Sequence, residues 1–309
     1  MNACACLWPA VLVFAQVVQL PAPSSNERCA TSGPSADQLL RLYRREVSDY
    51  EIYRDAERRE KLDLNQNSIC SWTNPSKDAL AQGVLFVWTY RGCAEVVGGA
   101  WSHPQGARRA VFHEFNSLSR RVLKPTRASG GFVWSPQAAV ARLTIADAEA
   151  PAESSRKRLL QLRALAREFS AHSTTPDRQR WELRVLANPL FRYESTDDEL
   201  LDGGVFAFVS SAGTDPEVLM VIEATKGDDP RWQCAFGRLS VYDTFVERAG
   251  RTVWSSVWTS RQASGHTATH DAEHTFEVYR DKMIDELPVD RGDAGAQNEE
   301  RPSAGSSRP

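Results

Sequence analysis

The sequence has none of the short motifs that would by themselves indicate a chemistry. It contains no Gly-x-Ser-x-Gly elbow, no phosphate-binding loop, no Gly-x-Gly-x-x-Gly fingerprint and no Cys-x-x-Cys pair. A formal net charge of −3 over 309 residues gives no overall field that would attract nucleic acid or an anionic membrane. We therefore expect no nucleic-acid partner and no resident cofactor.

The sequence is also poor in long hydrophobic runs, and the run at its N-terminus differs from the rest. Residues 1–22 contain no charged side chain, and residues 7–20 are almost wholly apolar. That run is shorter than the ~20 residues that a transmembrane helix needs, but it suits a secretory signal. We predict a signal peptide over 1–22, cleaved after Ala15 or Ala22, although only the terminal amine gives it positive charge. The chain is then exported to the periplasm or outside the cell, has no integral membrane span, and meets its partner there.

Cysteine is scarce once the predicted signal peptide is removed. Four cysteines remain after Cys4 and Cys6 are lost: Cys29, Cys70, Cys93 and Cys234. In an oxidising compartment they allow three disulfide pairings, and the sequence does not choose among them. Buried thiols that act as small hydrophobic side chains are an equal alternative.

The second half of the sequence repeats the first about 121 positions later. Residues 83–88 read GVLFVW and residues 204–209 read GVFAFV, and each run leads through a glycine into a Glu-Val pair. Further matches at this spacing join Phe115 to Phe236. We interpret the pattern as a tandem duplication. The alternative is two unrelated antiparallel sheets that share strand alternation and turn glycines.

Composition divides the chain into two similar halves. Residues 23–35, rich in Ser, Pro, Thr and Gly, predict a flexible lead-in, and residues 148–155 predict a polar linker. The first repeat covers residues 36–147 and the second covers 156–287. Residues 288–309 have no apolar face and predict a disordered tail.

Each half is predicted to contain one helix followed by five or six antiparallel strands. Apolar residues recur at helical spacing over 36–49, where Ser35 is placed to cap the helix, and over 155–171. The fold class is therefore α+β, with a helix on each sheet. The strands expected in the two halves cover 61–64, 69–72, 83–90, 95–101, 110–117 and 131–134, then 181–185, 190–193, 204–210, 217–224, 232–239 and 252–258.

The densest group of metal-ligand residues is His266, His270 and His274, with Asp271 and Glu273 among them. On a helix, spacings of four would place the three imidazoles on one face, where they could hold zinc or a similar divalent metal. The residues around His266 are poor helix formers. An exposed polar loop that happens to be rich in histidine is the alternative.

Two tryptophans are candidates for a ligand-binding surface. Trp88 aligns with Val209 and Trp101 with Glu223, so neither position is aromatic in both repeats. Both could stack on a sugar or another planar ligand, or they could belong to ordinary sheet packing. His113-Glu114 resembles an acid–base pair, but neighbouring residues of a strand point to opposite faces, so we expect no shared proton.

Several segments resemble a family of uncharacterised exported proteins of planctomycete bacteria. They are YEIYRDA at 50–56, SWTNP at 71–75, FVWT at 86–89, HEFNSLS at 113–119, RYEST at 192–196 and SAGTDPE at 211–217. The resemblance covers residues 38–258 and implies a cell-envelope or extracellular setting, with no activity attached. Cys70 and Cys93 depart from the similar sequences, which argues against a disulfide shared across the family.

Three functions stay open. The first is an exported, non-enzymatic binding or scaffold protein, which the duplication, the signal segment and the lack of a catalytic motif favour. The second is a metal-dependent hydrolase that uses His266, His270 and His274 as ligands and Asp271 or Glu273 as general base. The third is a carrier of a small apolar or planar ligand, held between helix and sheet near Trp88 and Trp101.

Overall fold

A computed structural model describes residues 34–73, 81–195, 199–211, 213–257 and 268–287. The predicted signal peptide, the predicted tail and all of the lead-in except its last two residues lie outside this part of the chain. The described residues form two helices and mostly antiparallel strands. The fold is therefore mixed, mainly β with some α, as the α+β prediction requires.

The first sheet combines strands from the N-terminal half with a hairpin from the C-terminal end. Its strand order is β17-β18-β6-β5-β4-β2, and β3 also pairs with β4. The strands are β2 (Asp63–Leu64), β3 (Cys70–Thr73), β4 (Gln82–Tyr90), β5 (Cys93–Gln105), β6 (Arg108–Ser117), β17 (Ala268–His270) and β18 (Phe276–Asp285). The predicted hairpin turn between β4 and β5 is confirmed, with positive φ at both Arg91 and Gly92.

The second sheet follows the order β16-β15-β9-β10-β12-β13-β14-β8, and β11 also pairs with β12. A separate pair joins β1 to β7. The strands of the second sheet are β8 (Leu143–Thr144), β9 (Phe169–Thr174), β10 (Arg180–Val185), β11 (Phe191–Tyr193), β12 (Leu200–Ser210), β13 (Pro216–Thr225), β14 (Trp232–Arg238), β15 (Asp243–Arg248) and β16 (Arg251–Ser256), and the separate pair is β1 (Tyr50–Tyr53) and β7 (Lys124–Arg127).

One helix precedes each set of strands. Helix α1 (Ala36–Val47) begins where predicted, because the Ser35 side chain accepts a hydrogen bond from the Gln38 N–H and the Gln38 side chain accepts one from the Ser35 N–H. Its apolar stripe is buried. Helix α2 (Ser155–Ala166) is capped by Ser154, whose hydroxyl accepts from the Lys157 N–H.

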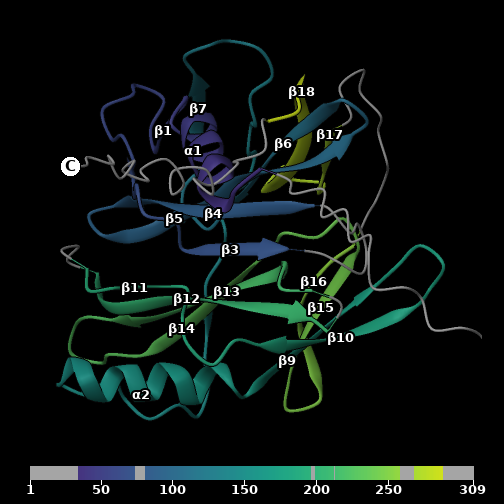
Figure 1. The fold of residues 1–309 in the computed structure, drawn as a ribbon. Helices are drawn as coiled ribbons and strands as arrows, with labels where there is room; N and C mark the ends of the chain where they lie inside the picture. The colour runs from purple at the N-terminus through teal and green to yellow at the C-terminus, as the bar shows by residue number, and fades with distance from the viewer. Residues whose placement is uncertain (1–33, 74–80, 196–198, 212, 258–267, 288–309) are drawn as a thin grey trace, which may run out of the picture.

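The elements stack in four layers (Figure 1). Helix α1 packs on the outer face of the first sheet, α2 packs on the outer face of the second, and the two sheets face each other. On β4, Phe86 and Trp88 point toward α1, whereas Leu85 and Val87 point toward the second sheet. Because both faces of the central strands are buried, their sequence is continuously apolar rather than alternating.

The order of strand pairings after α1 recurs after α2. In the first set β1 pairs with β7, β2 and β3 pair with β4, and β5 lies between β4 and β6. In the second set β9 pairs with β15, β10 and β11 pair with β12, and β13 lies between β12 and β14. Seven strands of each half therefore correspond in sequence order and in these pairings, with one difference: β9 also pairs with β10, whereas β1 and β7 form a separate two-stranded sheet.

The register of these strands corrects the sequence alignment by one residue. Trp72 pairs with Gly83, and Tyr193 pairs with Gly203, so Gly83 corresponds to Gly203 rather than to Gly204. A shift of one residue exchanges the two faces of a strand. Trp88 consequently corresponds to the aromatic Phe208, and both lie in a core between helix and sheet.

The edge strands cross the predicted repeat boundaries. Strand β18 belongs to residues 156–287 but pairs with β6 of the first sheet, and β8 belongs to residues 36–147 but pairs with β14 of the second. Each sheet is thus completed by a strand from outside its own predicted repeat.

The helix predicted over 155–171 is too long. It ends at Ala166, and the chain continues as a strand from Phe169. Phe169 and Ala171 are buried and Ser170 is exposed, so the period is already two at this point.

The strand predicted over 131–134 is also wrong. Gly130 and Gly131 both have positive φ, which interrupts an extended chain. Trp134 is nevertheless buried, and its indole N–H donates to the His274 carbonyl at 2.7 Å. The apolar run therefore marks packing rather than a strand.

Candidate functional site

A cavity of about 280 Å³ lies between the two sheets. This volume is just below the usual range for pockets that hold drug-sized ligands, so it suits a smaller molecule. The described residues that line it come from both sheets: Trp72, Ala81, Trp101, Glu114, Phe276 and Val278 from the first, and Asp215, Glu217, Leu239, Ser240, Val241 and Tyr242 from the second.

Strands β5 and β6 place Trp101 and Glu114 side by side on the wall of the cavity. Trp101 pairs with Phe112, and its ring stacks on the Phe112 ring at 4.0 Å between centroids. Glu114 is two residues further along β6, so it shares the face of Phe112. His113 points to the opposite face, as predicted, and the two side chains do not meet.

A second tryptophan completes the aromatic wall because Gly83 has no side chain. A Cβ atom at Gly83 would lie 2.4 Å from two ring atoms of Trp72 and 2.7 Å from the Trp101 Cβ. The Trp72 indole therefore lies directly over the backbone of β4, with its ring centroid 6.1 Å from that of Trp101.

The opposite wall is acidic. Asp215 and Glu217 lie at the start of β13, and the Ser240 hydroxyl donates to Glu217 Oε2 at 3.4 Å. None of the described lining residues is a lysine, an arginine or a histidine. The cavity thus combines an aromatic wall with carboxyl groups from both sheets.

Burial changes the acidity of Glu114. Only 5% of its surface is exposed, and burial together with the charge of Asp215 raises its pKa well above the ordinary value. A neutral Glu114 carboxyl donates a hydrogen bond, and an ionised one attracts a cation. Such perturbed carboxyl groups are common in binding and catalytic sites.

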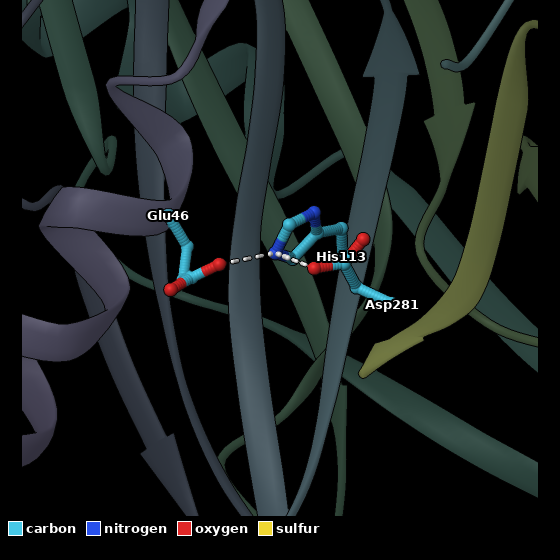
Figure 2. Close-up of side chains that lie close together, drawn as sticks. All are labelled: Glu46, His113 and Asp281. Carbon is cyan, nitrogen blue, oxygen red and sulfur yellow. Dashed lines mark ion pairs between the residues drawn. The ribbon is translucent and has the colours of Figure 1, made fainter. Parts of the chain in front are cut away.

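A second cluster of polar side chains is buried between α1 and the first sheet. Figure 2 shows Glu46 on α1, His113 on β6 and Asp281 on β18 converging. His113 Nε2 lies 3.4 Å from Glu46 Oε2 and 3.9 Å from Asp281 Oδ2. Tyr50 fixes the other ring nitrogen, since its hydroxyl lies 2.6 Å from Nδ1.

Both carboxylates of this cluster already have cationic partners. Lys282 donates to Glu46 Oε2 at 2.6 Å, and Arg127 binds Asp281 through two N–H groups, at 2.5 and 3.0 Å. Burial alone would raise the pKa values of both carboxyl groups, but these hydrogen bonds and the imidazole outweigh it and lower both. A divalent metal bound here would have to displace Lys282 and Arg127, so we assign the cluster to holding α1 and β18 on the sheet.

The two predicted ligand-binding tryptophans lie on opposite faces of the first sheet. Trp101 lines the cavity between the sheets. Trp88 is 1% exposed and lies in the core beneath α1, 5.7 Å from the Phe115 ring. They do not share a pocket between helix and sheet.

Two of the predicted metal ligands, His270 and His274, lie in the hairpin that contains β17 and β18, whereas His266 lies outside the described residues. The His270 and His274 rings stack at 3.8 Å between centroids. The Asp271 carboxylate accepts hydrogen bonds from Thr275 and Phe276 and so stabilises the turn. Within the described residues, the only group whose ligand atoms converge on one point is Glu46, His113 and Asp281.

None of the three described cysteines forms a disulfide with another described residue, and Cys29 lies outside the described residues. Buried thiols, one of the two sequence-based alternatives, hold for Cys93 and Cys234, whereas Cys70 is half-buried. In the described part of the chain, no helix has the length and apolarity to cross a membrane.

Sequence reasoning did not predict the cavity, although it named Trp101. Trp72 was not among the candidate ligand-binding residues, and Glu114 was discussed only with His113. A useful signal was present: Glu114 lies in the run AVFHEF at 110–115, where four of the other five residues are apolar. A carboxyl group in a strand that is buried on both sides requires a specific environment.

No family model matches the chain, and no curated protein or solved structure shows significant similarity to it. The resemblance to exported planctomycete proteins stays a prediction.

Proposed function

We propose that this chain is a binding protein that holds a small ligand in the cavity between its two sheets. The observation that carries the proposal is the cavity itself, where Trp72 and Trp101 form an aromatic wall beside the buried carboxyl of Glu114. Aromatic faces supply contact area, and a few polar groups fix orientation, which is the usual composition of a small-molecule site.

The binding role is the one expected from the sequence, but the proposed site lies between the two sheets instead of beneath the helix. The sequence-based carrier hypothesis placed a ligand beneath the helix, near Trp88. That space is filled by the core that surrounds Trp88, whereas the space between the sheets contains the cavity.

Mass spectrometry and thermal unfolding test the proposal together. The purified protein is denatured and its extract examined for a retained small molecule, and a chemically diverse library is screened for compounds that raise Tm. A ligand at about a hundred times its Kd stabilises by roughly 2.7 kcal/mol, which a melt detects readily. Stabilisation should be lost in Trp101→Leu and kept in Trp254→Leu, which changes an indole outside the cavity.

Two results would overturn the proposal. One is a retained molecule or stabilising compound that acts equally on the wild type and on Trp101→Leu. The other is a library in which no compound changes Tm, together with an extract that contains no bound molecule.

We also infer that the two halves arose by tandem duplication. The recurring order of helix and seven strands, with the same pairings, supports this origin. Sequences of homologues provide the test: inferred ancestral halves should be more similar to each other than the present halves are. Ancestral halves that are no more similar would contradict duplication.

Export is the remaining part of the proposal, and the apolar segment within residues 1–22 supports it. N-terminal sequencing of the protein from its producing cells tests it. A mature chain that begins at Gln16 or Pro23 is expected, and a full-length chain retained in the cytoplasm would contradict export.

A further inference from the structure

The cavity has a counterpart elsewhere between the sheets. In each sheet an aromatic side chain lies over a glycine, and a third residue pairs with that glycine from the next strand. The two sets are Trp72, Gly83 and Trp101 in the first sheet, and Tyr193, Gly203 and Glu223 in the second.

The loops that face these two sets also correspond. After β6 and after β14, one backbone N–H donates to a glutamate carbonyl, and a later N–H donates to a serine hydroxyl. The four bonds are Leu118 to Glu95 at 2.8 Å and Arg121 to Ser119 at 3.0 Å, then Leu239 to Glu217 at 2.9 Å and Tyr242 to Ser240 at 3.2 Å. The loop after β14 lines the cavity, and the loop after β6 reaches Glu223 through Arg120.

The location around Glu223 is filled by guanidinium groups of the chain itself. Arg142 donates from Nε to Glu223 Oε2 at 2.7 Å, and its side chain is 6% exposed. Arg120 donates to the same oxygen at 3.0 Å, and the Tyr193 hydroxyl donates to Oε1 at 2.7 Å. Glu223 is therefore a buried carboxylate whose charge is neutralised by Arg142 and Arg120.

At the cavity, valine occupies the position that corresponds to Arg120. Val241 follows Ser240 as Arg120 follows Ser119, in loops with matching backbone hydrogen bonds. Val241 lines the cavity.

Valine also occupies the position that corresponds to Arg142. Strand β8 lies beside β14 as β18 lies beside β6. Leu143 pairs with Cys234 in antiparallel strands, so Arg142 lies opposite Ala235, the next residue of β14. In the first sheet the corresponding position opposite β6 belongs to Val278, which pairs with Glu114 and lines the cavity.

The comparison indicates the chemistry of a ligand that would fit the cavity. Where the second location has two arginines and one carboxylate, the cavity has two valines, an aromatic wall and the carboxyl group of Glu114. We infer, on the basis of the binding function proposed above, that the ligand is a small molecule with a guanidinium group, which lies against Trp72 and Trp101 and pairs with Glu114. A guanidinium group stacks on aromatic faces and binds a carboxylate through two N–H groups.

The acidity of the site couples binding to proton release. Asp215, Glu217 and Tyr242 line the cavity opposite Glu114, and Cys70 on β3 contributes an ionisable thiol on its own side. A guanidinium ligand favours the ionised carboxyl, so Glu114 gives up its proton as the ligand binds. We expect calorimetry in buffers of different ionisation enthalpy to detect proton release at neutral pH.

Three matched probes test the inference with the full-length protein. Butylguanidinium, butylamine and butylurea share the chain length, and only butylurea is an uncharged planar isostere of the guanidinium. We expect butylguanidinium to bind most tightly, butylurea at least tenfold more weakly, and Glu114→Gln to weaken butylguanidinium binding at least tenfold, because a charge-assisted hydrogen bond is lost. Glu182→Gln, the same change at a side chain that is 69% exposed, should leave binding unchanged.

The outcomes separate this inference from the proposed function. Equal binding of butylurea and butylguanidinium, or undiminished binding to Glu114→Gln, overturns the guanidinium assignment while a ligand found in the library screen keeps the binding function. Failure of all three probes to bind also overturns the assignment.

A reverse substitution gives a second test that does not depend on the choice of probe. Val278→Arg places a guanidinium at the position that corresponds to Arg142, so it should pair with Glu114, raise Tm and abolish butylguanidinium binding. A lower Tm in this variant with unchanged binding would contradict the correspondence of the two locations.

Discussion

The buried pair of Arg142 and Glu223 allows a quantitative test of how much an ion pair between the sheets contributes to stability. The two side chains are 6% and 1% exposed, and their closest nitrogen and oxygen lie 2.7 Å apart. Removing one partner of a buried pair typically costs about 3–5 kcal/mol, because the other charge stays buried. Arg120 keeps its 3.0 Å contact with Glu223, so we expect Arg142→Met to lower the free energy of unfolding by about 3 kcal/mol.

Urea unfolding followed by tryptophan fluorescence measures this loss as a lower midpoint at unchanged slope. Arg180→Met is the matched control, since Arg180 and Glu182 form a pair whose side chains are 52% and 69% exposed, and it should cost less than about 1 kcal/mol. Adding Glu223→Gln to Arg142→Met removes the buried carboxylate charge that has lost its closest partner and should restore part of the loss. A loss below about 1 kcal/mol, or no recovery in the double variant, would refute the reasoning.

The loss of stability in Arg142→Met should also depend on pH, in a direction set by the pKa of Glu223. Burial alone would raise the pKa of Glu223, but Arg142, Arg120 and the Tyr193 hydroxyl outweigh it and lower the pKa. A carboxyl whose pKa is lower in the folded state contributes stability above its unfolded pKa of about 4.3, and this stability is lost as the pH falls through the folded pKa. The difference in stability between wild type and Arg142→Met should therefore be full at pH 7 and shrink only as the pH falls below about 4.3.

Three further predictions concern the sheets, the cluster beneath α1 and the thiols. Gly203→Ala should lower the free energy of unfolding by about 1–3 kcal/mol in chemical denaturation, because its Cβ would lie 2.5 Å from the Tyr193 ring. Gly204→Ala should cost clearly less, because its Cβ would lie 3.3 Å from its nearest neighbour, and equal costs would contradict the close approach at Gly203. Glu46→Gln should lower Tm more at pH 7 than at a pH below the folded pKa of Glu46, because that pKa is lowered and the contribution of the carboxylate is lost only as the pH falls through it. A pH-independent difference would argue against the ion pairs. Burial raises the pKa of Cys234 to about 11, so its thiol should react slowly with iodoacetamide at pH 8 in the native protein and quickly in urea, and rapid native reaction, read by mass spectrometry, would contradict its burial.

The sequence predicted the features that depend on local chemistry. Helix α1 ends within two residues of its expected end, because its apolar spacing is regular and Ser35 with Gln38 forms a capping box. The hairpin turn at Arg91 and Gly92 followed from turn chemistry in the same way.

Features that depend on which faces meet were not predictable to the same degree. The repeat was aligned one residue out at Gly204, and this single step changed Trp88 from a core aromatic into an apparent exception. Sequence identity cannot detect the error, because residues 203 and 204 are both glycine and Gly83 matches either of them. The strand register does detect it, because it shows which glycine pairs with the aromatic residue. The ligand wall at Trp101 and Glu114 also needs the second sheet in place before it becomes a cavity.

Strand β18 escaped prediction for a related reason. Its charged residues, among them Arg280, Asp281 and Lys282, hide the alternation of Phe276 and Val278 toward the second sheet. The charges of Asp281 and Lys282 are paired with Arg127 and Glu46, which are distant in the chain, so no local pattern reveals these partners.

The position of β18 has a consequence for how the molecule is made. Asn116 at the end of β6 pairs with Phe276, 160 residues later in the chain, so the first sheet has an open edge until β18 has been synthesised. Contacts between such distant residues form late and slow the folding reaction. A growing chain that has not reached β18 exposes the β6 backbone and lacks both Asp281 and Lys282 beneath α1. The first sheet therefore cannot be completed before β18 has been synthesised, and until then its unpaired edge must be shielded against pairing with other chains.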